Sequence, residues 1–188
     1  MKNILFAAIF CAAFAISAFA QAKPADYSGT WTLDIPQSKL DVRTRIESMT
    51  MTVTQTDKEL KVTSETKRQA PPADAAAAPA GGPGAGRGPG RGGAGGDGTV
   101  VYSLDGKETT IEVDGPNGKM PVKYTASLDG GKANLSSSRS FNAGPMGDVT
   151  VTTKEVWSLS ADGKTLTVVR EQSSPRGSNS STMVFVKK

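Results

Sequence analysis

Two arginines and one glutamate in the second half of the chain have the residue types of an anion site, in which the arginines bind the anion. Arg139, Glu155 and Arg170 each lie among apolar residues on one side of a segment in which side chains alternate with period two. If these segments are neighbouring strands, the three charged groups converge beside Ser137 and Thr153. One guanidinium then neutralises the glutamate, and the other is able to hold a carboxylate in a bidentate pair. The alternative is a solvated ion-pair cluster near one end of the fold.

This convergence depends on how the strands pair. We expect one hairpin to pair Trp157 with Leu166 and the preceding one to pair Phe141 with Val149. The first pairing sets the glutamate diagonal to Arg170, with the threonine directly opposite that arginine. The second sets the other arginine diagonal to the same threonine. A shift of the register by one residue would turn the whole set outward.

The chain offers little for catalysis or metal binding. Its single Cys is Cys11, in an N-terminal leader, and it has no His, so a Cys nucleophile, a His base and a Cys/His zinc site are all missing from the rest. The serines at 137, 138 and 140 have no adjacent base except lysines such as Lys154. Three aspartates, at 105, 129 and 162, fall in turns, where the side chain stabilises the backbone locally. The sequence predicts a protein that is not an enzyme and uses no cofactor or metal.

Residues 1–20 have the three parts of a secretory signal peptide. Lys2 provides the positive charge, an apolar run extends from Ile4 to Ile16, and residues 18–20 form a small-x-small cleavage site. The apolar run is shorter than the roughly 20 residues that span a bilayer. The sequence therefore predicts an exported protein, periplasmic or secreted, with no membrane span.

The remainder of the chain is interrupted by an insertion made mostly of Gly, Ala and Pro. Residues 69–98 have this composition, which buries too little apolar surface to offset the entropy of ordering. We expect a disordered insertion at 69–98 within a single domain, whose first strands lie in 21–68 and whose remaining strands lie in 99–188. The formal net charge of +4 is small and scattered, which argues against a nucleic-acid partner.

Outside the insertion, period-two alternation predicts ten strands and no helix of useful length. Trp31, Leu33 and Ile35 share one face of the first strand, and Met120–Leu128 is the longest clean run. Pro36–Leu40 has room for one helical turn. A meander with one apolar face hides that face by curling into a barrel, which also removes its edges. The predicted fold class is all-β, an antiparallel up-and-down meander barrel of about 8–10 strands, with an open two-sheet sandwich as the alternative.

Asp-Gly pairs between the alternating runs favour antiparallel hairpins. Both residues of such a pair tolerate the positive φ that tight hairpin turns require. Three of these turns are expected to join paired strands, at Asp105-Gly106, Asp129-Gly130 and Asp162-Gly163.

The opening Gly29-Thr30-Trp31 resembles the Gly-x-Trp start of the calycin barrels, which are the lipocalins, fatty-acid-binding proteins and avidins. More closely, the chain resembles bacterial exported lipocalin-like proteins, which share this opening and a Leu-Ser-x-Asp-Gly-Lys-Thr-Leu-Thr-Val segment, here at 159–168. The resemblance implies a lipocalin-like barrel with a small-molecule cavity, in which Gly29 and Trp31 are structural markers. Fatty-acid-binding proteins hold a carboxylate with an Arg-x-Tyr pair on the last strand, where this chain has Met183 and Phe185.

Two functions are consistent with this reading. The first is binding of a small apolar or anionic amphiphilic molecule in the barrel interior. The alternative is a solid-core structural or interaction protein of the cell envelope with no ligand. The candidate ligand-binding residues for the first are Arg139, Arg170, Glu155, Thr153 and Tyr124.

Overall fold

The computed structural model describes residues 24–41, 44–69, 97–115, 118–144 and 147–188. The signal peptide predicted at 1–20 and most of the insertion predicted at 69–98 lie outside these residues. These described residues form ten strands, as predicted from the alternation. They are β1 (Gly29–Leu33), β2 (Ile46–Gln55), β3 (Glu59–Arg68), β4 (Gly98–Ser103), β5 (Thr109–Gly115), β6 (Gly118–Asp129), β7 (Lys132–Asn142), β8 (Asp148–Leu159), β9 (Thr165–Ser174) and β10 (Gly177–Lys187).

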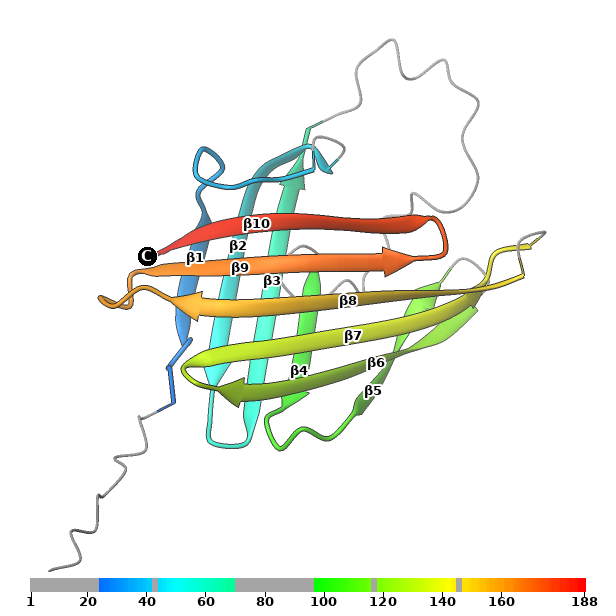
Figure 1. Ribbon diagram of the computed structural model, residues 1–188, viewed down its shortest axis with the longest axis horizontal. Helices are drawn as coiled ribbons and strands as arrows, with labels where there is room; N and C mark the ends of the chain where they lie inside the picture. The colour runs from blue at the N-terminus through cyan, green and yellow to red at the C-terminus, as the bar shows by residue number, and fades with distance from the viewer. Residues whose placement is uncertain (1–23, 42–43, 70–96, 116–117, 145–146) are drawn as a thin grey trace, which may run out of the picture.

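The strands form one antiparallel sheet in the order β4-β3-β2-β1-β10-β9-β8-β7-β6-β5. Neighbours in the chain are neighbours in the sheet except β4 and β5, and β10 returns to pair with β1. In Figure 1, β1–β4 run behind the long strands β6–β10, which cross in front of them. The sheet curls into a nearly closed barrel, so the predicted fold class is confirmed.

The barrel has one seam, between β4 and β5, which are the two edges of the sheet. The prediction that Asp105-Gly106 joins a hairpin is therefore wrong, although the other two Asp-Gly turns do join paired strands, β6 with β7 and β8 with β9. After β4 the amide of Leu104 donates to the Lys58 carbonyl (2.8 Å), which prolongs the contact with the β2–β3 turn. The chain then leaves β4 and pairs β5 with β6 instead.

Three aromatic side chains fill one end of the barrel, called here the closed end. Tyr27, Trp31 and Trp157 are fully buried. The Trp31 indole donates to the Tyr27 carbonyl (2.9 Å), and the Tyr27 hydroxyl lies 3.0 Å from the Gly131 carbonyl oxygen and 3.1 Å from that of Trp157. Because each polar atom has an acceptor, these large rings seal the closed end without leaving a donor unpaired.

Between β1 and β2 the structure differs from two expectations, the inward position of Ile35 and a helical turn at 36–40. Ile35 is not on the inner face, because β1 ends before it, and its side chain is 37% exposed. Pro36–Leu40 forms no helical turn of its own: the Ser38 amide closes a turn on the Ile35 carbonyl (3.0 Å). Lys39 then forms an isolated bridge with Thr182 on β10.

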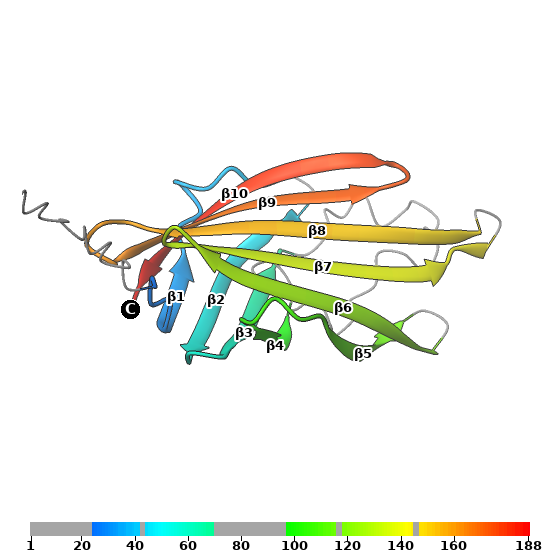
Figure 2. The same cartoon turned by 60° about the horizontal axis from the view of Figure 1, so that its bottom comes forward.

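The opposite end, called here the open end, is where β5 meets β6, β7 meets β8 and β9 meets β10. Figure 2 shows the long strands β6–β10 extending toward it beyond β1–β4. Inward-facing side chains become more exposed toward the open end. Leu135 and Trp157 are buried, whereas Phe141, Val149 and Val151 are only half-buried. Apolar side chains near the open end are therefore incompletely covered by the described residues.

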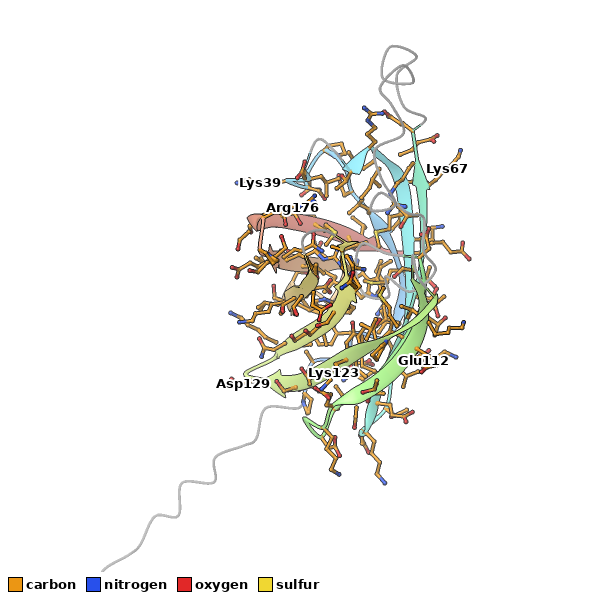
Figure 3. All side chains as sticks on the ribbon, turned by 90° about the vertical axis from the view of Figure 1, so that its right-hand side faces the viewer. Lys39, Lys67, Glu112, Lys123, Asp129 and Arg176 are labelled. Atoms are coloured by element: carbon orange, nitrogen blue, oxygen red, sulfur yellow. The ribbon has the colours of Figure 1, made fainter. Side chains whose placement is uncertain are left out.

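Charged side chains cover the outside of the barrel, as Figure 3 shows for six exposed examples. No helix in the described part of the chain has the length and apolar character needed to cross a membrane. The six labelled residues are Lys39, Lys67, Glu112, Lys123, Asp129 and Arg176.

Replacing Gly29 with Ala tests the packing of β1 against the C-terminus. Gly29 has a φ of 138°, and a Cβ there would lie 2.6 Å from Cε of Lys187, whose ammonium sits 5.2 Å from the centroid of the Trp31 ring. We expect Gly29→Ala to lower the free energy of unfolding by about 1–3 kcal/mol, measured by urea denaturation. Gly118→Ala is the control, because Gly118 has a φ of 114° but no atom within 4 Å of its Cβ position. Equal losses in both variants would mean that Lys187 moves aside at no cost.

Candidate ligand-binding site

The candidate site lies on the inner face of β7, β8 and β9, and the strand register assembles it. Glu155 on β8 lies directly opposite Arg170 on β9 and, on its other side, opposite Leu135 on β7. Arg139 on β7 is one inward-facing position further from Leu135 than Ser137, toward the open end. The alternation that puts Leu135 and Trp157 in the core therefore puts these charged side chains inside as well.

Glu155 is the most deeply buried charged residue among those described, with 4% of its surface exposed. Its Oε1 lies 2.9 Å from Nη2 of Arg170, and its Oε2 accepts a hydrogen bond from the Trp157 indole at 2.9 Å. A buried carboxylate is costly unless it is both paired and hydrogen-bonded. Both requirements are met here, so Arg170 is committed to Glu155.

The register of β8 and β9 differs from the expected one by two residues. Leu159, not Trp157, pairs with Leu166, because Ser160 and Thr165 close a tighter turn through the Ser160 amide and the Thr165 carbonyl (2.9 Å). Glu155 is therefore opposite Arg170 instead of diagonal to it. The expected pairing of Phe141 with Val149 is present.

Arg139 has no ion pair or hydrogen bond with any described residue, and its Nε is buried without a partner. It lies opposite Val151 on β8 and Val122 on β6. Burial lowers the pKa of Arg139; Tyr124 acts in the opposite direction, and the positive charge of Arg170 lowers the pKa further. An arginine remains protonated despite such shifts, so Arg139 is a positive charge on the inner wall that forms no ion pair with an acid among the described residues.

Two tyrosines stand next to this cluster. The rings of Tyr102 on β4 and Tyr124 on β6 meet edge to face, with centroids 5.6 Å apart. No ladder of backbone hydrogen bonds joins β4 and β5. The ring contact therefore connects the two sides of the seam. Burial raises the pKa of Tyr102 well above its usual value; the charge of Glu155 and Tyr124 add to the rise, and Arg170 opposes it.

The sequence analysis named Tyr124 but missed Tyr102. The alternation of Val100 and Tyr102 places that ring inside, but nothing in the sequence indicated that β4 would face β6. Thr153 is half-buried on the same face as Glu155, opposite Gln172 and Ser137. It makes no hydrogen bond to the charged groups among the described residues, so it lies beside the cluster without joining it.

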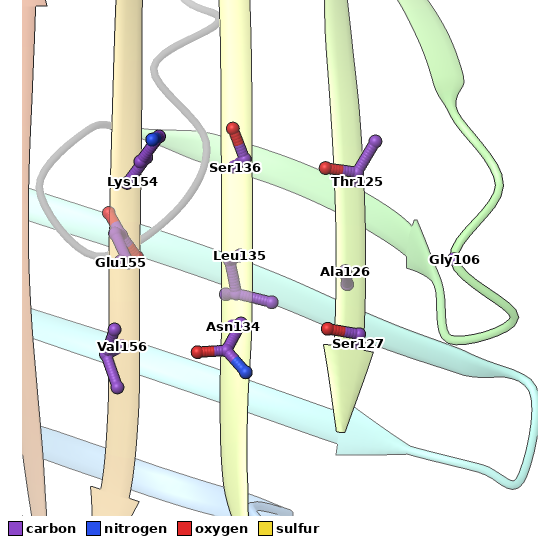
Figure 4. Close-up of a pocket in the computed structure, with 10 residues that line it drawn as sticks. All are labelled: Gly106, Thr125, Ala126, Ser127, Asn134, Leu135, Ser136, Lys154, Glu155 and Val156. Atoms are coloured by element: carbon purple, nitrogen blue, oxygen red, sulfur yellow. The ribbon is translucent and has the colours of Figure 1, made fainter. Parts of the chain in front are cut away.

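A separate hollow of about 380 Å³ lies on the other side of the same wall. Its exposed and half-buried side chains belong to the outer face of β6–β8, while Ala126, Leu135 and Glu155 between them are buried (Figure 4). It is therefore distinct from the arginine cluster inside the barrel. The lining residues are Gly106, Thr125, Ala126, Ser127, Asn134, Leu135, Ser136, Lys154, Glu155 and Val156.

Comparison with known proteins adds no identification. No protein-family model, curated protein or solved structure matches the chain. The architecture itself, a nearly closed antiparallel barrel of ten strands, is compatible with a lipocalin-like fold. Within the described residues, no three His, Cys, Asp or Glu side chains come close enough together to hold a metal ion.

The ion pair between Glu155 and Arg170 predicts that the stability of the fold depends strongly on Arg170. Arg170→Met leaves the Glu155 carboxylate buried without a counter-charge, and we expect it to lower the free energy of unfolding by about 3–5 kcal/mol. Adding Glu155→Gln removes the stranded charge and keeps an acceptor for the Trp157 indole, so the double variant should recover most of the loss. Urea denaturation of the two single variants and the double variant gives the coupling energy. A double variant as unstable as Arg170→Met would show that the ion pair is not the cause.

The three tyrosines of the chain predict how the fold responds to alkali. Burial raises the pKa of Tyr27, Tyr102 and Tyr124 in the folded state, whereas an unfolded tyrosine titrates near about 10. The protonated tyrosines therefore contribute stability in full below pH about 10, and this contribution is lost as the pH rises toward the folded-state pKa values. Tyrosinate absorbance at 295 nm should appear together with the loss of β circular dichroism. Absorbance that rises near pH 10, as in a urea-unfolded control, while the dichroism stays intact would contradict this.

Proposed function

We propose that the protein is an exported binding module that holds a small apolar or anionic amphiphilic molecule inside its barrel. The observation that carries the proposal is Arg139, an inward-facing guanidinium with no ion pair or hydrogen bond among the described residues. The signal-peptide pattern at residues 1–20 supports export. The proposed role is binding, without a chemical step.

The charge arrangement supports an anionic group on the ligand. A charge taken out of water is costly unless a counter-charge accompanies it. Arg170 already has its counter-charge in Glu155, at 2.9 Å, whereas Arg139 has none among the described residues. A planar guanidinium in this state is preorganised for an oxyanion, because its N–H groups match two oxygens at once.

The surroundings of Arg139 support an apolar part on the same ligand. Val151 lies directly opposite Arg139, and Phe141 and Val149 form the next inward-facing pair toward the open end. All three are half-buried, so a hydrocarbon chain that covers them gains the free energy of removing both surfaces from water, about 0.8 kcal/mol per buried CH₂. In this proposal the charged group lies deep, at Arg139, and the tail points to the open end.

The alternative is a structural or interaction protein of the cell envelope whose barrel holds no ligand. The packed aromatic rings of the closed end favour it for that half of the interior, where Tyr27, Trp31 and Trp157 leave no exposed surface. The half-buried residues toward the open end and the unpaired Arg139 do not fit a solid core equally well.

The two functions are separated by removing the unpaired charge. Displacement of a fluorescent fatty acid by dodecanoate should report binding to the wild type, and Arg139→Met should weaken it by about ten- to hundred-fold, the loss of a charged hydrogen bond. Stability should stay level or rise, because no acid is stranded. Lys123→Met is the matched control: it removes a positive charge from the outer face of the same wall, where Lys123 pairs with exposed Glu108 at 2.8 Å. Absence of binding in the wild type would favour the solid-core alternative.

A further inference from the structure

The hollow on the outer face of β6–β8 has a regular floor of side chains. Two successive rows cross the three strands, with one residue per strand in each row. Neighbouring strands lie about 4.8 Å apart and the rows about 6.7 Å apart, so the floor measures about 10 Å by about 7 Å, the scale of one sugar ring. The rows are Thr125, Ser136 and Lys154, and then Ser127, Asn134 and Val156 (Figure 4).

The polar groups of this floor are not bonded to one another. Its hydroxyl and amide side chains make no hydrogen bond with any described residue. Adjacent outward hydroxyls elsewhere do bond: Oγ of Ser140 on β7 lies 2.8 Å from Oγ1 of Thr150 on β8, and Thr63 pairs with Thr99 in the same way. Serine, threonine and asparagine side chains both donate and accept. The floor therefore suits a ligand whose own groups donate and accept as well.

One wall of the hollow comes from the connection between β4 and β5. Gly106 lines this side, and the ion pair between Glu108 and Lys123 (2.8 Å) holds the connection to β6. The volume of about 380 Å³ lies near the lower end of the range for small-molecule pockets, about 300–1,000 Å³. The hollow therefore has the size of a site for a small ligand.

Lys154 gives the hollow a positive charge that no described acid neutralises. Glu171 lies directly opposite it on β9, yet the two form no ion pair, whereas Lys123 on the same outer face pairs with its acid at 2.8 Å. Among the described lining residues the only other ionisable one is Glu155, whose carboxylate is paired with Arg170 inside the barrel. A ligand with one carboxylate balances the charge of the hollow.

Val156 adds an apolar contact beside these polar groups. Its side chain is 38% exposed, and Val169, directly opposite it on β9, is 45% exposed. The C–H groups on one face of a sugar ring gain free energy by covering such a surface. An inorganic anion such as sulfate has no C–H groups, and it accepts hydrogen bonds without donating any. A sugar acid therefore matches the polar groups, the charge and the apolar contact of the hollow together.

We propose that this hollow is a binding site for a sugar that carries a carboxylate, a uronate. Lys154 pairs with the carboxylate, Ser136 and Asn134 bond to ring hydroxyls, and Val156 contacts a C–H face of the ring. The hollow is on the opposite side of the wall from Arg139. The site is therefore separate from the proposed interior site and does not rest on it.

Galacturonate, galactose and acetate test the parts of this ligand, because galactose lacks the carboxylate and acetate lacks the ring. Titration of ¹⁵N-labelled protein should show that galacturonate binds about ten-fold or more tightly than either, with amide shifts confined to β6–β8 and Gly106. Trigalacturonate distinguishes the source of the ring: equal affinity indicates a free sugar and higher affinity a polysaccharide, and both support the site. Galactose or acetate that binds as tightly as galacturonate, or galacturonate that does not bind, would overturn the proposal.

Two pairs of matched variants test the residues. Lys154→Met should weaken galacturonate binding by about ten- to hundred-fold, the loss of a charged hydrogen bond, whereas Lys61→Met, which removes an exposed lysine from the outer face of β3, should not. Ser136→Leu fills the floor and should abolish binding, whereas Ser138→Leu, at the next outward position of β7 and outside the hollow, should not. Melting temperatures check that each variant is folded. Galacturonate affinity that is unchanged in Lys154→Met or in Ser136→Leu would overturn the assignment of the site.

Discussion

The buried carboxylate of Glu155 is the constraint around which this barrel is arranged. An acid with 4% exposure needs a counter-charge and hydrogen bonds on both oxygens. Arg170 supplies the first from the neighbouring strand, and Trp157 supplies a donor from the same strand. A one-residue slip between β8 and β9 would place Arg170 on the outer face and leave the acid unpaired. The ion pair therefore favours one register among those available.

Satisfying Glu155 with one arginine leaves the other without a partner. The same alternation that turns Arg170 inward turns Arg139 inward, but no acid on the described strands accompanies it. The interior is consequently divided between a closed end, packed by aromatic rings with paired polar atoms, and a half toward the open end with partly covered apolar residues. The surplus charge of Arg139 lies between these two halves.

The seam between β4 and β5 is crossed by side chains and not by a backbone ladder. No ladder of backbone hydrogen bonds joins these two strands, and the edge-to-face contact of Tyr102 and Tyr124 spans the gap instead. At this position side-chain packing holds the two sides of the barrel together, whereas backbone hydrogen bonds hold neighbouring strands together elsewhere. Asp105-Gly106, although it has hairpin chemistry, therefore lies in a connection between two strands that do not pair.

The sequence alone determined the strands and their inner faces, because period-two alternation is a local property of the chain. It also predicted that Arg139, Glu155 and Arg170 would face inward, and it predicted the pairing of Phe141 with Val149. The tertiary structure decided the rest. A shift of two residues keeps every side chain on the same face, so alternation could not distinguish the two registers of β8 and β9; the hydrogen bonds of their turn did. The contact of Tyr102 with Tyr124 depends on closure of the barrel, which brings β4 against β6 and which no local pattern indicates.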